Sequence, residues 1–215
     1  MIAKVAALEL PSKQWPELIP NLRSFMEQDP PNSGLRQSTL EALGYICEEA
    51  VSLEEDVLDQ EHVNSVLTAI VQGIGKTEAD SSVRLAATLA LQNALEFAES
   101  NFEKQSERDY LMQVVCEGTI AGDARVREAS FECLAGIAGL HYGKLSPYIS
   151  EIFKLTQQAI QRDEEPVAKQ AIEFWCTICE EELDLQAVCA FMLCSSASCC
   201  DTLASQMGCM SSQLL

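Results

Sequence analysis

A segment that recurs at a regular interval constrains the fold of this chain most. Each copy has a polar or acidic residue, two spacers and an aliphatic residue, followed in three of the four copies by arginine. The copies span residues 32–36, 80–84, 123–127 and 164–168. Their aliphatic residues Leu35, Val83, Val126 and Val167 lie 48, 43 and 41 residues apart. This spacing is typical of arrays of helical hairpins, in which each hairpin needs its neighbours to bury its apolar face.

Each copy also predicts the start of a helix. Asn32, Asp80 and Asp123 are favourable N-cap residues, because their side chains accept hydrogen bonds from free N–H groups of the first turn. In the fourth copy, Pro166 suits the first helical position, where its missing N–H does no harm. Apolar residues at helical spacing follow every copy. The pattern predicts helices over 35–49, 83–98, 126–140 and 167–182.

A first helix precedes each of these. Val63, Val66, Leu67, Ile70 and Val71 show the helical period clearly. The first helices are predicted over 15–26, 63–74, 106–119 and 148–160, the earliest opening at Pro16. No alternating strand pattern competes. The sequence therefore predicts an all-α fold, an α-α superhelix (HEAT/armadillo-like solenoid) of about four helical hairpins. The solenoid is expected over 1–186, with approximate repeats 10–51, 57–98, 105–141 and 144–183.

Both ends of the chain differ from a capped array. Residues 1–8 resemble the end of a helix whose partner is missing, and no polar capping repeat precedes them. Residues 187–215 hold no Lys or Arg and only one acid, Asp201. We interpret 187–215 as an atypical, poorly ordered Cys/Ser-rich tail, from a read-through, splice or frame-shifted terminus. A lipidated tail is the alternative, but Cys209 is too far from the end for a prenylation motif.

Composition limits the partners. The formal net charge is −19, which repels phosphate backbones, so nucleic acid is not an expected partner. Basic protein surfaces are favoured, although acidic residues also serve simply to keep a long surface soluble. No stretch approaches the roughly 18 apolar residues of a membrane helix, so no membrane partner is expected.

Nothing in the sequence indicates an enzyme. Cys176 and Cys179 have CxxC spacing but lie within a predicted helix, with no redox-fold context. The tail cysteines match no zinc pattern, and the two histidines, His62 and His141, lie far from them. No glycine-rich phosphate loop or Ser-His-Asp set is visible. We therefore predict no catalytic, cofactor or metal site.

Several short sequence segments within the repeats resemble one family. Residues 14–20, 38–47, 67–73, 112–117 and 172–175 are similar to the HEAT repeats of importin-β, the karyopherin-β nuclear import receptor. The resemblance runs from about Ile2 to Gln186 and implies the end of HEAT repeat 2 through HEAT repeat 6. The family's first repeats and its long C-terminal part have no counterpart here.

The resemblance implies a function in nuclear import. Members of the family carry cargo, often through importin-α, and release it when Ran-GTP binds. They cross the nuclear pore by weak contacts with Phe-Gly repeats of nucleoporins, so cytoplasm, nucleus and nuclear pore or envelope are the expected locations. Ran and importin-α or cargo binding is expected to be incomplete here, because the family holds these partners mostly through repeats that this chain lacks.

The resemblance also implies a site between the outer helices of repeats five and six. Its residues are Leu67, Val71, Glu107, Tyr110, Leu111 and Tyr148. At positions 71 and 110 the family often has Ile and Phe, so the apolar character is kept. From periodicity alone, Leu67, Val71 and Leu111 are better explained as core residues, and only the resemblance favours the site.

A HEAT scaffold of another kind, such as a phosphatase regulatory subunit with no transport role, is the alternative function. The repeats of such a scaffold are more regular in length than the unevenly spaced repeats found here. A scaffold of that kind also does not explain the segments that are similar to importin-β.

Overall fold

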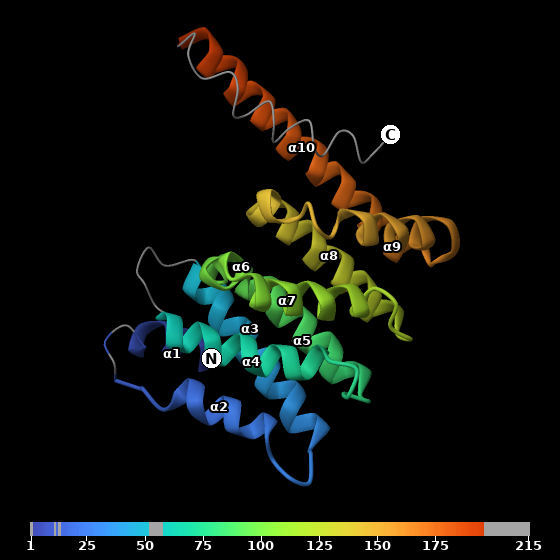
Figure 1. Ribbon diagram of the computed structural model, residues 1–215. Helices are drawn as coiled ribbons and strands as arrows, with labels where there is room; N and C mark the ends of the chain where they lie inside the picture. Colours follow the sequence, from blue (N-terminus) through green and yellow to red (C-terminus); the bar gives the residue numbers. More distant parts are fainter. Residues whose placement is uncertain (1, 11, 13, 52–57, 196–215) are drawn as a thin grey trace.

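The computed structural model describes residues 2–10, 12, 14–51 and 58–195 (Figure 1). Within these ranges the chain forms ten α-helices and two short 3₁₀ turns, and no strand. The α-helices are α1 (Ile2–Glu9), α2 (Leu18–Met26), α3 (Ser33–Val51), α4 (Gln60–Ile74), α5 (Ser81–Ala94), α6 (Glu99–Glu103), α7 (Gln105–Gly118), α8 (Ala124–His141), α9 (Ile149–Arg162) and α10 (Glu165–Ser195). This confirms the all-helical solenoid. None of the described helices is long and apolar enough to cross a membrane.

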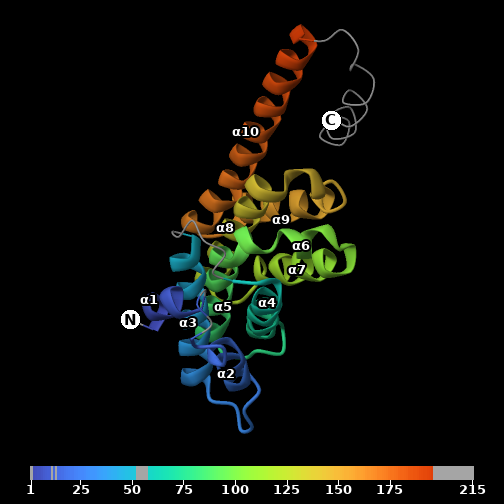
Figure 2. The same cartoon turned by 90° about the vertical axis from the view of Figure 1, so that its left-hand side faces the viewer.

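The helices stack in two rows. The second helices of the hairpins pack in the order α3, α5, α8, α10, and α1 lies against α3. The first helices form the other row, in which α2 packs on α4 and α4 on α7 (Figure 2). Each hairpin thus packs on the next through its second helix, and the hairpins up to α7 do so through their first helices as well, as in a solenoid.

The predicted N-caps are confirmed. Asn32 Oδ1 accepts from the Leu35 N–H at 3.1 Å, and Asp80 and Asp123 accept from the N–H groups two residues on, both at 2.9 Å. A fourth cap, Asp59, was not expected from the sequence; it accepts from the His62 N–H at 2.9 Å. These bonds satisfy N–H groups that the first turn of a helix leaves free.

The cap residues also connect successive repeats. Hydrogen bonds from the Ser82 backbone and from the Ser33 side chain, one repeat back, lower the pKa of Asp80. Hydrogen bonds from Arg125 and from Ser81, again one repeat back, lower the pKa of Asp123 to about 2. The caps Asp80 and Asp123 therefore hold the starts of α5 and α8 against the preceding second helix.

Arginines of the recurring segment donate hydrogen bonds to oxygen atoms near the same turns. Arg84 Nε donates to the Ile74 carbonyl at 3.2 Å. Arg127 donates to the Ala121 carbonyl at 2.9 Å and to both carboxylate oxygens of Asp163, at 2.8 and 2.6 Å. A guanidinium suits this place because it has several donors in a fixed plane. Arg84 and Arg127 therefore close the ends of two first helices, and Arg127 also reaches the next repeat.

Close helix packing in the core depends on glycine at two positions. A Cβ at Gly73 would lie 2.7 Å from Ala87 Cβ and 2.8 Å from a Leu40 methyl. A Cβ at Gly44 would lie 3.1 Å from Ala90 Cα. Interiors packed to crystal density leave no room for these extra atoms.

Four expectations need correction. Pro16 lies in a turn, and the first of the predicted helices begins only at Leu18. Pro166 is the second residue of α10. The helix predicted to end at residue 182 continues to Ser195, across the expected tail boundary at 187. No Gly or Pro interrupts this stretch, so nothing local stops the helix. The rest of the expected tail, 196–215, lies outside the described residues. The short helix α6 was not predicted.

Candidate peptide-binding grooves

A groove of about 410 Å³ lies between α4 and α7. We call it the first groove. Its lining residues are Asn64, Leu67, Thr68 and Val71 with Gln72 from α4, Asn101 from α6, and Glu107, Tyr110 and Leu111 from α7. Five of the six predicted site residues are among them, which leaves only Tyr148 elsewhere.

The floor of the first groove is apolar and mostly buried. Leu67 and Val71 are one helical turn apart and face the same side of α4. Val71 is 9% exposed, and Leu67 and Leu111 are buried further. Tyr110, in contrast, is 54% exposed and forms one wall. The floor residues therefore belong to the core and also present their tips to the groove, so the core and groove interpretations both hold for them.

One end of the first groove is polar. Asn101 is only 5% exposed, and its Nδ2 donates to Asn64 Oδ1 at 2.9 Å and to Glu107 Oε2 at 2.7 Å. Gln60 Nε2 donates to Asn101 Oδ1 at 3.2 Å and to Asn64 Oδ1 at 3.0 Å. Lys104 Nζ contacts Glu107 Oε1 at 3.0 Å. The hydrogen bonds from Lys104 and Asn101 keep the pKa of Glu107 below its usual value, so this carboxylate is ionised at neutral pH.

The sequence analysis did not predict the polar end. Asn64 lies at a solvent-facing position of a helix, and Asn101 lies in a short helix without a recognisable period. The one available sequence signal was the number of amide side chains near an apolar helix face, namely Gln60, Asn64 and Asn101. A single sequence does not show that these amides come together in space.

A second groove, of about 310 Å³, lies between α7 and α9. Its lining residues are Asp109, Met112, Gln113, Cys116, Glu117, Ile120, Tyr148, Glu151 and Leu155. The Tyr148 hydroxyl donates to Asp109 Oδ1 and accepts from Arg108 Nε at 3.3 Å. Burial, and next the bond to Asp109, raises the pKa of Tyr148, so the phenol stays neutral. Tyr148 therefore belongs to this neighbouring groove, with Ile120 as its most exposed apolar residue.

The repeat numbers implied by the resemblance need one adjustment. If the hairpin of α2 and α3 is repeat three, then α4 and α7 are the first helices of repeats four and five. The first groove then lies one repeat earlier than the pair five and six expected for it.

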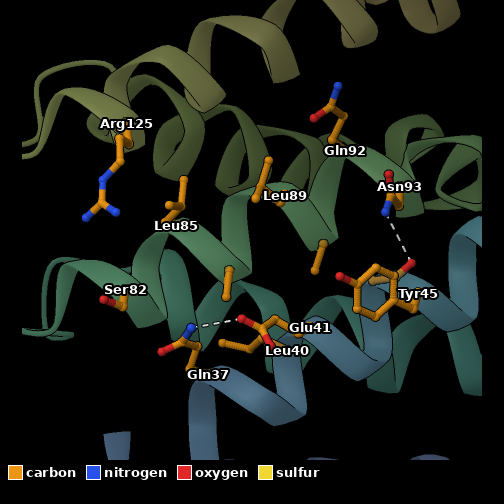
Figure 3. Close-up of a pocket in the computed structure, with 13 residues that line it drawn as sticks. Gln37, Leu40, Glu41, Tyr45, Ser82, Leu85, Leu89, Gln92, Asn93 and Arg125 are labelled. Atoms are coloured by element: carbon orange, nitrogen blue, oxygen red, sulfur yellow. Dashed lines mark hydrogen bonds between the residues drawn. The ribbon is translucent and has the colours of Figure 1, made fainter. Parts of the chain in front are cut away.

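A third groove, of about 340 Å³, opens on the opposite row, between α3 and α5 (Figure 3). We call it the opposite groove. Gln37 Nε2 donates to Glu41 Oε1 at 2.8 Å, and Asn93 Nδ2 donates to the Gly44 carbonyl at 3.3 Å. Figure 3 shows both bonds and Arg125, which reaches the groove from α8. Much of the polar rim is thus already bonded within the protein.

The described residues contain no group of three or more His, Cys, Asp or Glu side chains placed to hold a metal ion. Cys176 and Cys179 are both exposed thiols on α10. Buried thiols elsewhere have raised pKa values, as Cys47 does at about 12 because of burial, and are therefore poor nucleophiles.

Known proteins that are similar to this chain match it over most of its length. No family model matches. Importin subunit beta-1 of Arabidopsis thaliana is 53% identical over 185 residues, which is 86% of this chain and 21% of that protein. The solved Kap95:Nup1 complex matches with a TM-score of 0.80 and 39% identity, over 93% of this chain and 22% of that one. A Kap95p structure that concerns the switch loops of RanGDP matches with a TM-score of 0.79 and 38% identity, with the same coverage. The chain thus spans about a fifth of the length of the relatives it matches.

Proposed function

The chain belongs to the importin-β family by sequence and by fold, and from this premise we propose that it binds Phe-Gly nucleoporin repeats and supports protein import into the nucleus. The observation that carries the proposal is the first groove. It combines an apolar floor, an exposed aromatic wall and a polar end in one site between two repeats. A phenylalanine ring flanked by backbone fits those three features. The matched Kap95:Nup1 complex, in which a protein of this fold is joined to Nup1, supports the same assignment.

The expected affinity suits transport. Burial of one phenylalanine ring contributes about 1.5–3 kcal/mol, so a single contact is weak and exchanges quickly. The second groove, one repeat along the same row, offers a place for a second ring of the same peptide chain. Linked weak contacts add through effective concentration, which gives useful binding without slow release.

The proposal extends to the other partners of the family in weaker form. A Kap95p structure concerned with RanGDP is among the matches, and we propose Ran and importin-α or cargo as partners whose binding is incomplete in this chain. The proposed locations are cytoplasm, nucleus and nuclear pore or envelope. We propose a binding role without catalysis, in line with the similarity to importin subunit beta-1.

A phosphatase-regulatory type of HEAT scaffold is the other function considered. The relative reported above is an importin subunit beta-1, at 53% identity, and the two structures are of Kap95, at 38–39% identity, one of them concerned with nuclear import complex assembly. That similarity favours transport, and nothing specific to the described grooves favours the scaffold.

A titration tests the proposal. The full chain, labelled for NMR, is titrated with a peptide that carries one FxFG motif. We expect saturable binding with a dissociation constant on the order of 0.1–1 mM, from burial of one or two rings. The shifted signals are expected to cluster on α4 and α7.

One protein variant and one control peptide sharpen the titration. Tyr110→Ala removes an exposed wall, so the fold is kept while affinity is expected to fall about tenfold. A peptide in which alanine replaces phenylalanine is the matched ligand control and is expected not to bind. If the folded chain does not bind the FxFG peptide, the proposed function is wrong and only membership of the family remains.

A further inference from the structure

The polar end of the first groove is formed by Asn64, Asn101 and Glu107. We propose that Asn101 is a positioning residue, which holds Asn64 and Glu107 as a paired donor and acceptor for the backbone of one residue next to the bound phenylalanine. This inference rests on the proposed function, because it assigns a specificity element to the same groove.

Asn101 fixes the direction in which the Asn64 amide points. Asn64 Oδ1 accepts from both Asn101 Nδ2, at 2.9 Å, and Gln60 Nε2, at 3.0 Å. Both contacts need an oxygen, so the Asn64 NH₂ group must point away from them. No hydrogen bond is recorded for that NH₂ group among the described residues, and Asn64 lies at the groove surface. The NH₂ group is therefore a donor that is free for a ligand.

Asn101 also fixes Glu107. The Nδ2 group of Asn101 donates its second hydrogen to Glu107 Oε2 at 2.7 Å. Lys104 Nζ contacts the other carboxylate oxygen, Oε1, at 3.0 Å. Each carboxylate oxygen keeps one further acceptor position. The carboxylate is therefore ionised, held from both sides, and still able to accept a hydrogen bond from a ligand.

A peptide backbone matches this arrangement. In an extended segment, the N–H and C=O of one residue point to the same side, as in the bonded pairs of an antiparallel sheet. Glu107 then accepts the N–H and Asn64 donates to the C=O, while the neighbouring ring occupies the apolar floor. This requires no side chain on the recognised residue, so it favours small residues beside the phenylalanine.

Asn101 itself is well suited to a positioning role. It is nearly buried, and both hydrogens of its amide and its oxygen are bonded. Its three partners come from α4 and α7, so it joins two helices across the groove. The helix that carries it, α6, is in turn held by Arg108, which donates to the Phe102 carbonyl. A buried polar group that is fully bonded specifies one geometry.

The experiment combines protein variants with backbone-modified peptides. The full chain is titrated with the FxFG peptide and with copies that are N-methylated in turn at one phenylalanine and at each of its two neighbours. In the wild type, one of these methyl groups is expected to weaken binding about fivefold, the usual effect of one hydrogen bond. In Asn101→Ala the same methyl group is expected to change the affinity by less than about twofold, because the acceptor is no longer held in place.

A purely structural role predicts another result. In that case Asn101→Ala weakens all peptides by the same factor and the discrimination against the methylated peptide stays. If Asn101→Ala loses helicity by circular dichroism, Asn101→Asp, which keeps the shape but not the donor, takes its place with the same expected result. Asn93→Ala is the matched control, since it removes an interhelical asparagine bond in the opposite groove (Figure 3).

A second variant tests the donor. Asn64→Asp keeps an oxygen for Asn101 and Gln60 but removes the NH₂ group, and it changes an exposed side chain. We expect the unmodified peptide to bind about threefold more weakly. Wild-type affinity in this variant, or equal affinity of the wild type for every N-methylated peptide, overturns the inference. Failure of the wild type to bind the unmodified peptide instead refutes the proposed function, so the two failures are distinguishable.

Discussion

The first groove and the opposite groove lie in overlapping repeats but are built differently. Across the opposite groove, α3 and α5 approach so closely that a Cβ at Gly44 would lie 3.1 Å from Ala90 Cα. Across the first groove, α4 and α7 carry large side chains, and the Asn101 network joins their ends. Close backbone contact leaves a groove with a polar rim, while spaced helices leave an apolar slot.

The comparison teaches where a solenoid has room for a ligand side chain. Small residues between two helices allow the backbones to meet, which stabilises the stack and leaves mainly polar side chains to line the groove above the contact. Large apolar residues whose tips are only partly covered hold the helices apart and offer a ring-sized site. In this chain the two conditions fall on opposite rows, so the two faces are expected to differ in what they bind.

The largest expected effect comes from a charge placed in each groove. Val71→Asp puts a carboxylate on the floor of the first groove, where a bound ring would desolvate it, and we expect affinity for the FxFG peptide to fall about 100-fold. Leu89→Asp, on the half-exposed rim of the opposite groove, is the matched variant and should leave that affinity unchanged. Isothermal titration of both folded variants measures the difference. Equal losses in both variants would remove the distinction between the two faces.

The second largest expected effect concerns the close contact between α3 and α5 at Gly44. Gly44→Val forces extra atoms against the Ala90 backbone, and we expect a loss of about 2 kcal/mol in the free energy of unfolding. Gly34→Ala is the control, because a Cβ there meets only Asn32 Oδ1, at 3.5 Å. Urea denaturation followed by circular dichroism gives both values. A Gly44→Val variant as stable as the wild type would show that close packing does not define the opposite groove.

The pH dependence of stability is expected to arise near the opposite groove and its caps. The folded pKa of Asp123 is lowered to about 2, chiefly by Arg125, against 3.8 ordinarily. The stability that this carboxylate contributes is therefore complete above about pH 4 and is lost as the pH falls toward 2. Thermal melts of Asp123→Asn, which retains a capping oxygen, should show a weaker decline over that range. The same decline in the variant would assign the effect to other carboxylates.

The smallest expected effect is the removal of one hydroxyl from the first groove. Tyr110 is half-exposed and no hydrogen bond is recorded for its hydroxyl among the described residues. Tyr110→Phe should therefore change the affinity for the FxFG peptide by less than about twofold, because the apolar wall is kept. A larger loss, measured by the same titration, would mean that the hydroxyl contacts the ligand directly.

Much of the fold was predictable because it is local. The caps at Asn32, Asp80 and Asp123 follow from residue type and position, and the helices after them follow from their apolar period. The end of α10 was not predictable from the change in composition at residue 187, because charge and helix-forming tendency are different properties. The short helix α6 has five residues, too few for any period to be visible.

The candidate site was predicted only in part. The resemblance named six residues, and the structure brings five of them together in the first groove and places Tyr148 in the second. Asn64 and Asn101 were missed because they lie 37 residues apart and meet only through the packing of α4 against α6 and α7.

The sequence by itself determined that this chain is a helical repeat array with segments similar to importin-β. Caps, apolar periods and repeat length are properties of neighbouring residues, and the folded chain keeps them. The tertiary structure alone decided which apolar side chains open onto a groove. The apolar stripe of a helix is wide enough to face two neighbours at once, so its period cannot tell a covered residue from a partly covered one. For Val71 and Tyr110, the spacing of α4 and α7 made that decision.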